Sequence, residues 1–257
     1  MTEPDPHRTI EAVWRIESPR LVASLARMLR DVGLAEDFAQ DALVAALERW
    51  PEAGVPDNPG AWLMATAKNR ALDHLRRGKL LEKKHEALGR TLEFERESAA
   101  ANFEAALDDD VGDDLLRLVF TACHPVLSPE ARVALTLRML LGLTTGEIAR
   151  AYLVPEATMA QRLVRAKRSL SEARVPFELP HGADRTNRLT SVLEVVYLIF
   201  NEGYAATAGS EWTRPQLCAE ALRLGRILVG LTPSEAEVHG LVALMEIQAS
   251  RLAARVG

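Results

Sequence analysis

The stretch LTTGEIARAYLVPEATMAQRLVRAKRSLSEA, from Leu143 to Ala173, is the part of the sequence that most constrains the fold. Thr144 is followed three residues later by Glu147, a spacing typical of a capping box, which predicts that a helix begins there and continues to Leu153. Val154 and Pro155 interrupt this helix, and Pro155 suits the first turn of a new one. The stretch therefore predicts a short helix, a tight turn without glycine, and a longer helix.

The longer helix has two different faces. Its apolar residues follow a spacing of four, three and four, which makes one stripe along a helix: Met159, Leu163, Ala166 and Leu170. Its other side carries polar and basic residues: Thr158, Gln161, Arg162, Arg165 and Arg168. This arrangement is typical of a helix-turn-helix whose second helix lies in a DNA major groove, because Arg pairs with guanine and Gln with adenine. The alternative is an amphipathic hairpin with a solvated cationic face.

The composition favours an all-α protein. The chain has 257 residues, of which 48% are hydrophobic and only 5% aromatic. Alanine and leucine dominate, which favours helices over sheets. The two cysteines provide no disulfide framework and indicate a reducing, cytoplasmic compartment. The N-terminus has no apolar signal core, and no apolar run approaches the length of a membrane span, so we expect no membrane partner.

Charge is distributed unevenly along the chain, although the net charge is only −5. From Lys68 to Lys84 there are seven cations and two anions, whereas from Glu86 to Asp114 there are ten anions and two cations. This alternation predicts basic surfaces joined by an acidic connector.

The first 85 residues predict three helices. Apolar residues at helical intervals occupy residues 8–32, with Gly33 as the stop. A second helix is expected from Ala35 to Trp50, with this inward face: Phe38, Ala42, Leu43, Ala46, Leu47 and Trp50. Asn58 caps the third helix and Pro59 opens it.

One face of the third helix combines Trp62 with polar and charged residues: Thr66, Asn69, Asp73 and Arg77. An exposed Trp beside amide and cationic groups suits unstacked bases, since the ring stacks on them and the cations hold phosphate. The alternative is a partly buried Trp that closes the helical bundle, with its charged neighbours solvated.

Two of these segments together resemble bacterial sigma factors of the extracytoplasmic-function type. AEDFAQDALVAALERW followed by NPGAWLMATAKNRALDHLRR is similar to their second conserved region, and VPEATMAQRLVRAKRSL is similar to the recognition helix of their fourth region. LRLVFTACHPVLSPEARVALTLRMLLGLTTGEIA, with FNEGYAA at 200–206, resembles a subgroup with a helical, tetratricopeptide-like C-terminal extension. Ala160 stands where the family usually has Lys or Arg, and Gln161 where Ser is common, so base preference is not transferred.

The resemblance implies a domain order and site residues. It assigns region 2 to residues 8–85, an acidic linker to 86–112, region 4 to 113–175 and the extension to 186–257. It implies docking on core RNA polymerase through Asp37, Gln40 and Asp41. It implies that region 2 contacts the −10 promoter element through these residues: Asp57, Asn58, Trp62, Asn69, Arg70, Asp73, Arg76 and Arg77. Region 4 then binds the −35 element through the polar and basic face of the longer helix: Thr158, Gln161, Arg162, Arg165 and Arg168.

Two further segments leave alternatives open. In the family the acidic linker threads near the polymerase active site, where acidic side chains mimic nucleic acid; the alternative is a solvated tether. Cys123 and His124 have no second Cys or His at ligand spacing, so a structural role is favoured over a metal or a nucleophile. No metal or cofactor is expected.

The segment after Pro176 predicts a third helical unit. We expect one helix at 187–200 and two more that begin at capping boxes, Thr213 to Gln216 and Thr232 to Glu235. The inward residues of the last two are expected to be Leu217, Ala221, Leu224 and Leu228, then Val238, Leu241, Leu244 and Ile247. The apolar run from Val192 to Phe200 must pack on these helices or on region 4. The unit has nine anions and seven Arg, which favours protein contacts over DNA contacts and suggests intramolecular regulation.

The sequence thus predicts a three-part all-α sigma factor, without enzymatic activity, whose partners are core RNA polymerase and promoter DNA. Two rival functions are weighed against it. The first is a dimeric helix-turn-helix regulator that binds operators without polymerase. The second is an enzyme that uses Cys218, His181 or His239, against which the absence of any catalytic spacing argues.

Overall fold

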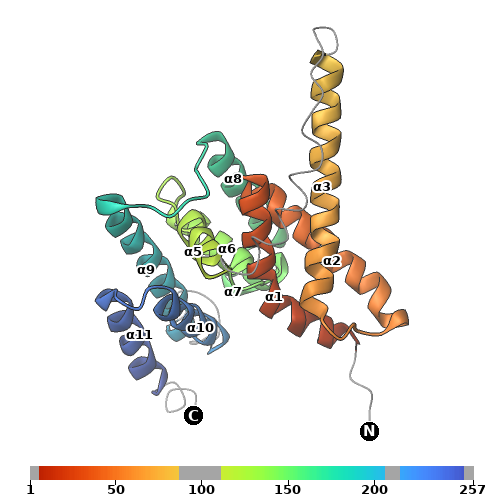
Figure 1. Ribbon diagram of the computed structural model, residues 1–257. Coiled ribbons are helices and arrows are strands. Elements are labelled where there is room, and N and C mark those ends of the chain that lie inside the picture. The colour runs from red at the N-terminus through yellow and green to blue at the C-terminus, as the bar shows by residue number, and fades with distance from the viewer. Residues whose placement is uncertain (1–5, 87–110, 206–214, 252–257) are drawn as a thin grey trace. The chain divides into compact units, whose positions relative to one another are not determined.

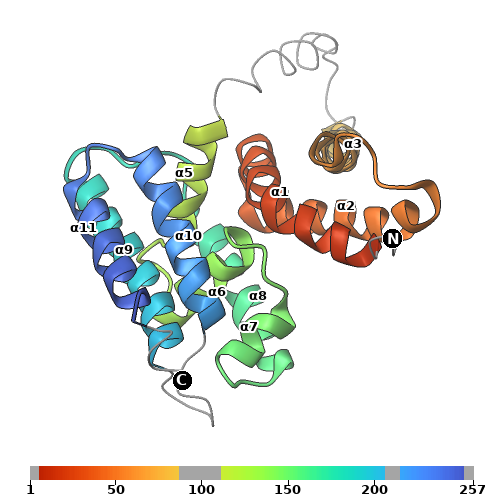
Figure 2. The same cartoon turned by 90° about the horizontal axis from the view of Figure 1, so that it is seen from below.

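In the computed structural model, residues 6–86, 111–205 and 215–251 are described, and every regular element among them is a helix. The expectation of an all-α fold is confirmed. The helices belong to two compact units, Met1–Asp114 and Leu115–Gly257 (Figures 1 and 2). The acidic linker expected at 86–112 falls almost entirely outside the described residues.

The described residues of the first unit include three helices that pack on one another: α1 (Pro6–Leu29), α2 (Val32–Ala53) and α3 (Pro59–Glu86). α3 extends past the ends of the other two (Figure 1). Its start follows the expected pattern, because the Asn58 side-chain oxygen accepts a hydrogen bond from the Ala61 N–H at 3.0 Å.

The core of this unit is built largely from small side chains. Five of the eight buried residues of α2 are alanines, which form a row along the helix: Ala35, Ala39, Ala42, Ala45 and Ala46. α3 adds Ala67 and Ala71, both fully buried. Because alanine has only a methyl group, these helices pack with little side-chain volume between them, and larger groups from α1, such as Leu21 and Leu25, fill the remaining space.

Two expectations about the first unit are wrong. Gly33 does not stop α1; it lies in the first turn of α2, because the Asp31 carboxylate accepts hydrogen bonds from the N–H groups of Gly33 and Leu34 and so caps α2. Leu47 is 38% exposed and not part of the core. The sequence pattern favoured large apolar residues as the inward face, whereas the alanine row is what faces α1 and α3.

In the described parts of the second unit, seven helices follow in chain order, the first of which begins just before the boundary between the units. They are α5 (Val111–Ala122), α6 (Pro129–Met139), α7 (Thr145–Ala151), α8 (Glu156–Glu172), α9 (Gly182–Tyr204), α10 (Pro215–Leu231) and α11 (Ala236–Ala249). α9 packs on α10 and α11, and it also packs on α6, which in turn contacts α7 and α8. The expectation that the run from Val192 to Phe200 packs on its following helices or on region 4 is confirmed, since it does both.

α6 is covered by neighbours on most of its circumference. From Arg132 to Thr136 every residue is buried, as are Leu137 and Met139. A helix that is buried all round belongs to the interior of a unit rather than to its surface. α6 is therefore the shared wall between the helix-turn-helix, α7 and α8, and the C-terminal helices.

α10 and α11 approach closely at a glycine. A Cβ atom on Gly225 would lie 2.8 Å from a Val242 methyl carbon and 3.0 Å from the Met245 methyl carbon. The absence of a side chain at this position is therefore what admits α11 to its place on α10.

The expected start and face of α11 are wrong. Thr232 is buried, its hydroxyl donates to the Leu228 carbonyl at 2.7 Å, and α11 begins only after Glu235. Val238 is buried as expected, but Leu244 and Ile247 are 46% and 57% exposed, and Met245 takes the inward position. Apolar residues occur on all sides of α11, between polar ones, so its sequence period did not identify the buried face. The other expected capping residue, Thr213, lies outside the described residues.

None of the helices in the described parts of the chain has the length and hydropathy that a membrane span requires.

Candidate nucleic-acid interface

α7 begins with the capping box that the sequence predicts. The Glu147 N–H donates to the Thr144 hydroxyl at 3.1 Å, and the Thr144 N–H donates to the Glu147 carboxylate at 2.7 Å. Both ends of this reciprocal pair satisfy backbone donors that a helix leaves open in its first turn. The short first helix of the motif is thus fixed locally by its own sequence.

The turn between α7 and α8 is made without glycine. Leu153 takes a left-handed backbone conformation with φ of 50°, which a non-glycine residue adopts at a cost. The turn is held by backbone bonds in which the N–H groups of Leu153 and Val154 donate to the carbonyls of Arg150 and Ala149. The Leu153 side chain is 53% exposed, so it is the backbone hydrogen bonds that hold this turn together.

α8 divides into the two faces that the sequence predicts. Met159, Leu163, Ala166 and Leu170 are all buried. Thr158, Gln161, Arg165 and Arg168 are exposed. Arg168 also pairs with Glu172 at 2.7 Å, one turn further along the exposed face. Sequence reasoning missed Val164, which is 60% exposed between these polar residues and adds an apolar group to the same face.

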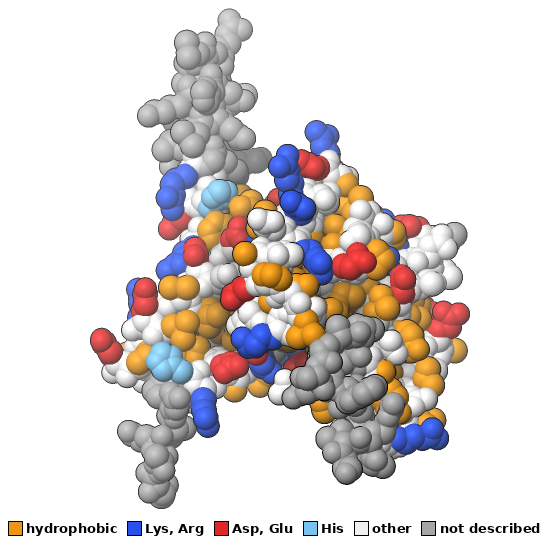
Figure 3. All heavy atoms as spheres, turned by 180° about the vertical axis from the view of Figure 1, so that it is seen from behind, with side chains coloured by type: hydrophobic (Ala, Val, Ile, Leu, Met, Phe, Trp, Pro, Cys, Tyr) orange, Lys and Arg blue, Asp and Glu red, His pale blue; other side chains and the backbone are white. Residues whose placement is uncertain are grey.

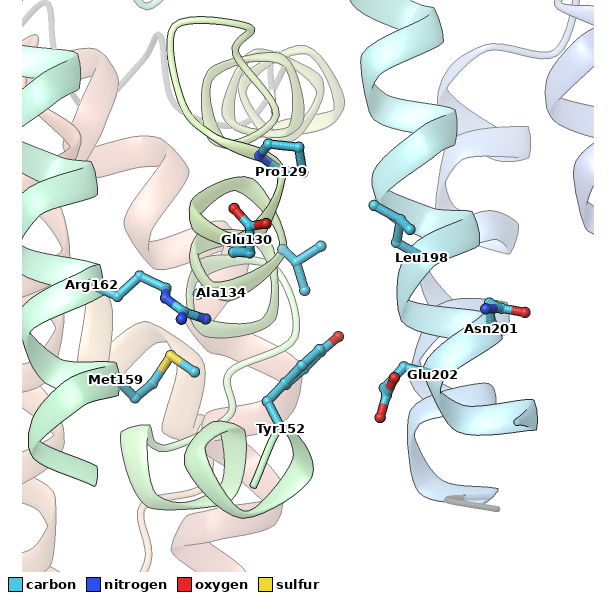
Figure 4. A pocket seen from close by; sticks show the side chains of 10 residues that line it. Pro129, Glu130, Ala134, Tyr152, Met159, Arg162, Leu198, Asn201 and Glu202 are labelled. Atoms are coloured by element: carbon cyan, nitrogen blue, oxygen red, sulfur yellow. The ribbon is translucent and has the colours of Figure 1, made fainter. Parts of the chain in front are cut away.

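Arg162 lies apart from this exposed group. Its side chain extends from α8 toward α6 and ends near Glu130 and Ala134 (Figure 4). The pKa of Glu130 is lowered first by a backbone hydrogen bond and the Ser128 hydroxyl, and further by the positive charges of Arg162 and Arg132. The Arg162 side chain is therefore directed toward α6 of its own unit, and its charge acts on Glu130.

In the first unit, Trp62 is half-buried and packs edge-on against the buried Trp50, with ring centroids 5.3 Å apart. This contact matches the alternative in which the ring closes the bundle, and it leaves one part of the indole accessible. The Asn58 side chain caps α3, as described above. Asp57, Asn69, Asp73, Arg76 and Arg77 are exposed.

Charges on α3 and α2 are partly paired with each other. Arg70 contacts Asp41 at 3.3 Å and also donates to the Asp41 carbonyl at 2.9 Å. Arg76 contacts Asp73 at 3.4 Å. Asp37 and Asp41 are exposed on α2, whereas Gln40 is half-buried and donates to Glu36. Asp37 and Asp41 thus place two carboxylates on the exposed surface of α2.

The C-terminal helices are joined to α5 and α6 by polar contacts that sequence reasoning missed. The Arg132 guanidinium donates to the Ser191 hydroxyl and to the Glu194 carboxylate, the latter at 2.9 Å. The Ser191 hydroxyl donates to the Cys123 carbonyl at 2.6 Å. Arg223 of α10 donates to the Leu141 carbonyl at 3.3 Å. In the sequence, the signal for these contacts is an arginine and a serine at inward positions of helices that are otherwise apolar.

Neither cysteine has the environment of a reactive thiol. Burial raises the pKa of the Cys123 thiol to about 12, and its sulfur lies 3.4 Å from the Thr136 hydroxyl. Burial also raises the pKa of Cys218 to about 11. A nucleophilic cysteine needs a lowered pKa, so both thiols are protonated at neutral pH, which argues against the enzymatic rival. Across the described ranges, no group of three or more His, Cys, Asp and Glu side chains could hold a metal ion.

The visible face in Figure 3 carries acidic and basic side chains intermixed, with hydrophobic side chains between them. Such mixing is ordinary for a protein surface.

Comparisons with known proteins identify three segments of the chain. Residues 14–80 match sigma-70 region 2, residues 117–170 match sigma-70 region 4, and residues 188–257 match a family of unknown function, DUF6596. The chain thus carries both sigma-70 regions in order, followed by a C-terminal extension, and the resemblance to extracytoplasmic-function sigma factors is confirmed.

Curated relatives agree with these domains. An uncharacterized protein of Rhizobium meliloti is 41% identical over 238 residues, which cover 92% of this chain and 56% of that protein. A probable ECF RNA polymerase sigma factor of Mycobacterium tuberculosis, SigI, is 28% identical over 169 residues, covering 66% of this chain and 57% of its own. The ECF sigma factor SigC of the same species is 26% identical over 175 residues, covering 66% and 82%.

The chain spans little more than half the length of the first two of these relatives, with 56% and 57% of them covered. No solved structure is significantly similar to it.

Proposed function

We propose that this chain, which carries sigma-70 regions 2 and 4, is a sigma factor that binds core RNA polymerase and directs it to promoters. The observation that supports this most is the pairing of two domains, a three-helix region 2 and a helix-turn-helix whose basic face is free of the extension's helices. Such a protein performs no chemistry of its own and acts in the cytoplasm, where the polymerase is.

Polymerase docking is assigned to Asp37, Gln40 and Asp41 on α2. Support comes from their position on the surface of a helix whose opposite side is the buried alanine row. Asp37 is chosen for the test because its side chain is exposed on α2. We expect Asp37→Lys to weaken the complex with core polymerase at least tenfold in a co-elution or fluorescence assay, through charge reversal at an exposed site.

Glu48→Lys is the matched control, because Glu48 is also exposed on α2 and lies about three turns away. Equal loss of binding in the two variants would point to a general charge effect and refute the docking assignment.

DNA contact is assigned to both units. Thr158, Gln161, Arg165 and Arg168 are proposed to read the −35 element, with Arg162 at their margin. Region 2 is proposed to hold the −10 element through these residues: Asp57, Asn58, Trp62, Asn69, Arg70, Asp73, Arg76 and Arg77. The support is the mixture of cationic, amide and partly accessible aromatic side chains, which matches the chemistry of phosphate and base contacts.

Arg165→Ala tests the −35 assignment. We expect it to lower promoter-dependent transcription by a factor of about ten or more, since a bidentate Arg contact contributes about 1–3 kcal/mol. Arg251→Ala, at an exposed position just beyond α11, is the control and should leave transcription unchanged. Transcription equal in the two variants would exclude α8 as the reading helix.

The rival function is a helix-turn-helix regulator that binds operators without polymerase. A sigma factor binds core enzyme in the absence of DNA, whereas a regulator shifts duplex DNA in the absence of polymerase. Purified chain mixed with core polymerase, analysed by native electrophoresis with and without DNA, separates the two. Binding to duplex alone, with no complex with core enzyme, would replace the proposed function by the rival.

We further propose that the extension regulates the DNA-binding unit from within the chain. The support is the set of ties from α9 and α10 to α5, α6 and Leu141, which make the extension part of the same compact unit as the recognition helix. Ser191→Ala and Glu194→Ala loosen these ties, and Thr190→Ala is their control. Unchanged transcription in both, together with faster hydrogen exchange of α9, would show that the extension is a passenger.

A further inference from the structure

One large apolar side chain, Val164, lies on the polar face of α8. Of the large apolar side chains that the structure describes in the second unit, it is the most exposed, at 60%. α8 already buries a separate apolar stripe, from Met159 to Leu170, so Val164 takes no part in the core. Valine is also a weaker helix former than alanine, because its branched Cβ restricts the side chain. Neither core packing nor helix propensity therefore accounts for a valine at this position.

Val164 has a polar neighbour on each side along the helix surface. Residues three and four positions apart are neighbours on a helix, so Gln161 lies one turn before Val164 and Arg168 one turn after it. All three side chains are exposed. Arg162, in contrast, is half-buried and extends toward α6 (Figure 4), so it is not part of this row. An amide, an isopropyl group and a guanidinium thus follow one another along the outward side of α8.

These three groups match three kinds of contact in the major groove of DNA. A glutamine amide pairs with adenine, and an arginine pairs with guanine or holds a phosphate. The apolar group that the major groove presents is the C5-methyl of thymine, which cytosine lacks, and apolar side chains recognise it. Ala157 and Ala160 are exposed seven and four positions before Val164, and their small side chains let the helix approach the base edges closely.

We propose that Val164 is a specificity-determining residue that contacts the C5-methyl group of a thymine, an inference that rests on the DNA contact assigned to α8 in the proposed function. An α-helix rises 1.5 Å per residue, so Val164 lies about 4.5 Å beyond Gln161 along the axis of α8. Base pairs are spaced about 3.4 Å apart, so the two side chains reach base pairs within about two steps of each other. The DNA sequence that α8 reads therefore contains a thymine close to the base that Gln161 contacts.

The contact is tested with deoxyuridine, which pairs as thymidine does and differs from it in the base only by the absence of the C5-methyl group. Duplexes are first selected from a randomised pool, once with the full chain alone and once with the chain and core polymerase. The recovered duplex is then synthesised with deoxyuridine in place of each thymidine in turn. We expect replacement of one thymidine to weaken binding about fourfold, as for the loss of one buried methyl group.

Val164→Ala identifies the side chain that contacts the methyl group. The position is exposed and alanine is the stronger helix former, so the substitution leaves the fold intact. We expect the variant to bind the thymidine and deoxyuridine duplexes alike, because the effects of two changes to one contact are not additive. Val126→Ala is the matched control, since Val126 is 46% exposed in the segment between α5 and α6, and it should keep the full preference for thymidine.

Three results would overturn the proposal. The first is a preference for thymidine that is as large in Val164→Ala as in the unaltered chain, since another group or the shape of the duplex would then account for it. The second is a recovered duplex in which no thymine methyl affects binding, and the third is recovery of no duplex by either preparation. Selection by the chain alone, without a complex with core enzyme, would count against the proposed function and leave the methyl test in force.

Discussion

The helix contacts of the first unit and the contact between α6 and α9 in the second unit are built in opposite ways. In the first unit, alanines such as Ala39 and Ala42 let α2 approach its neighbours through methyl groups alone. Between α6 and α9, buried Arg132 and Ser191 form a hydrogen-bonded tie beside apolar residues. The first contact is sensitive to added volume, and the second is sensitive to loss of a hydrogen-bonding partner.

The largest effect is expected from added volume in the alanine row. Ala42→Leu inserts three carbon atoms at a fully buried position, and we expect the free energy of unfolding of the first unit to fall by about 3 kcal/mol. Denaturant titration followed by circular dichroism measures this loss. Val44→Leu is the control on the same helix, since Val44 is 50% exposed and should change stability by less than about 0.5 kcal/mol.

A tolerated Ala42→Leu, with stability within the range of its control, would show that the alanine row is loosely packed. The helix contacts of the first unit would then not be sensitive to added side-chain volume, and this difference from the second unit would not hold.

The next effect is expected from removal of the Ser191 hydroxyl. Ser191→Ala leaves the Cys123 carbonyl and the Arg132 guanidinium each without one hydrogen bond, which should cost the second unit about 2 kcal/mol. The volume hardly changes, so the loss reports the hydrogen bonds. Thr190→Ala serves for comparison, because Thr190 is exposed and its hydroxyl donates to the Thr186 carbonyl of its own helix. If the two variants unfolded at the same denaturant concentration, the tie would contribute nothing to stability.

A matched pair of glycines on α10 separates the effect of volume from that of helix propensity. Gly225→Ala places a methyl group against Val242 and Met245, and we expect a net loss of about 1 kcal/mol. Gly230→Ala has no neighbour within 4 Å, and the better helix propensity of alanine should stabilise the unit by up to about 1 kcal/mol. Thermal unfolding of both variants should show opposite signs. The same sign in both would mean that α11 moves away from α10 without cost.

The smallest effect is a pH dependence at His124. Burial, followed by the positive charge of Arg188, lowers the pKa of His124 below its usual value of 6.5, while Asp184 opposes this shift. The unfolded chain therefore takes up the proton more readily than the folded one, and stability is lost as the pH falls below about 6.5. Urea titrations at successive pH values should show this loss in the unaltered chain and a shallower dependence in His124→Gln. A slope unchanged by the substitution would assign the dependence to other groups.

Much of the fold was readable because several elements are specified locally. The capping box at Thr144, the cap at Asn58 and the stripe from Met159 to Leu170 each depend on residues within a few positions of one another. The errors arose where the buried face depends on partners far along the chain. The inward side of α11 is set by the gap at Gly225, and no period within α11 reveals it.

The candidate site was predicted in its residue types and only partly in its geometry. The exposed positions on α8 follow from helix periodicity, whereas the direction of Arg162 depends on Glu130, which belongs to α6. Val164 is an apolar residue that lies 60% exposed on the polar face, where helix periodicity predicts polar residues. The hydrogen bond between Arg132 and Ser191 joins residues nearly sixty positions apart. Helix periodicity relates only residues within one helix, so it does not predict this contact.

The burial of α6 on most of its sides also determines how fast its backbone exchanges with solvent. A helix covered by α7 and α8 on one side and by α9 on another has no way to open its amides while its neighbours stay in place. Its hydrogens should therefore exchange only when the whole unit unfolds, at the global free energy. The helix-turn-helix and the extension then melt in one transition, so any ligand of the extension raises the melting temperature of the DNA-reading helix as well.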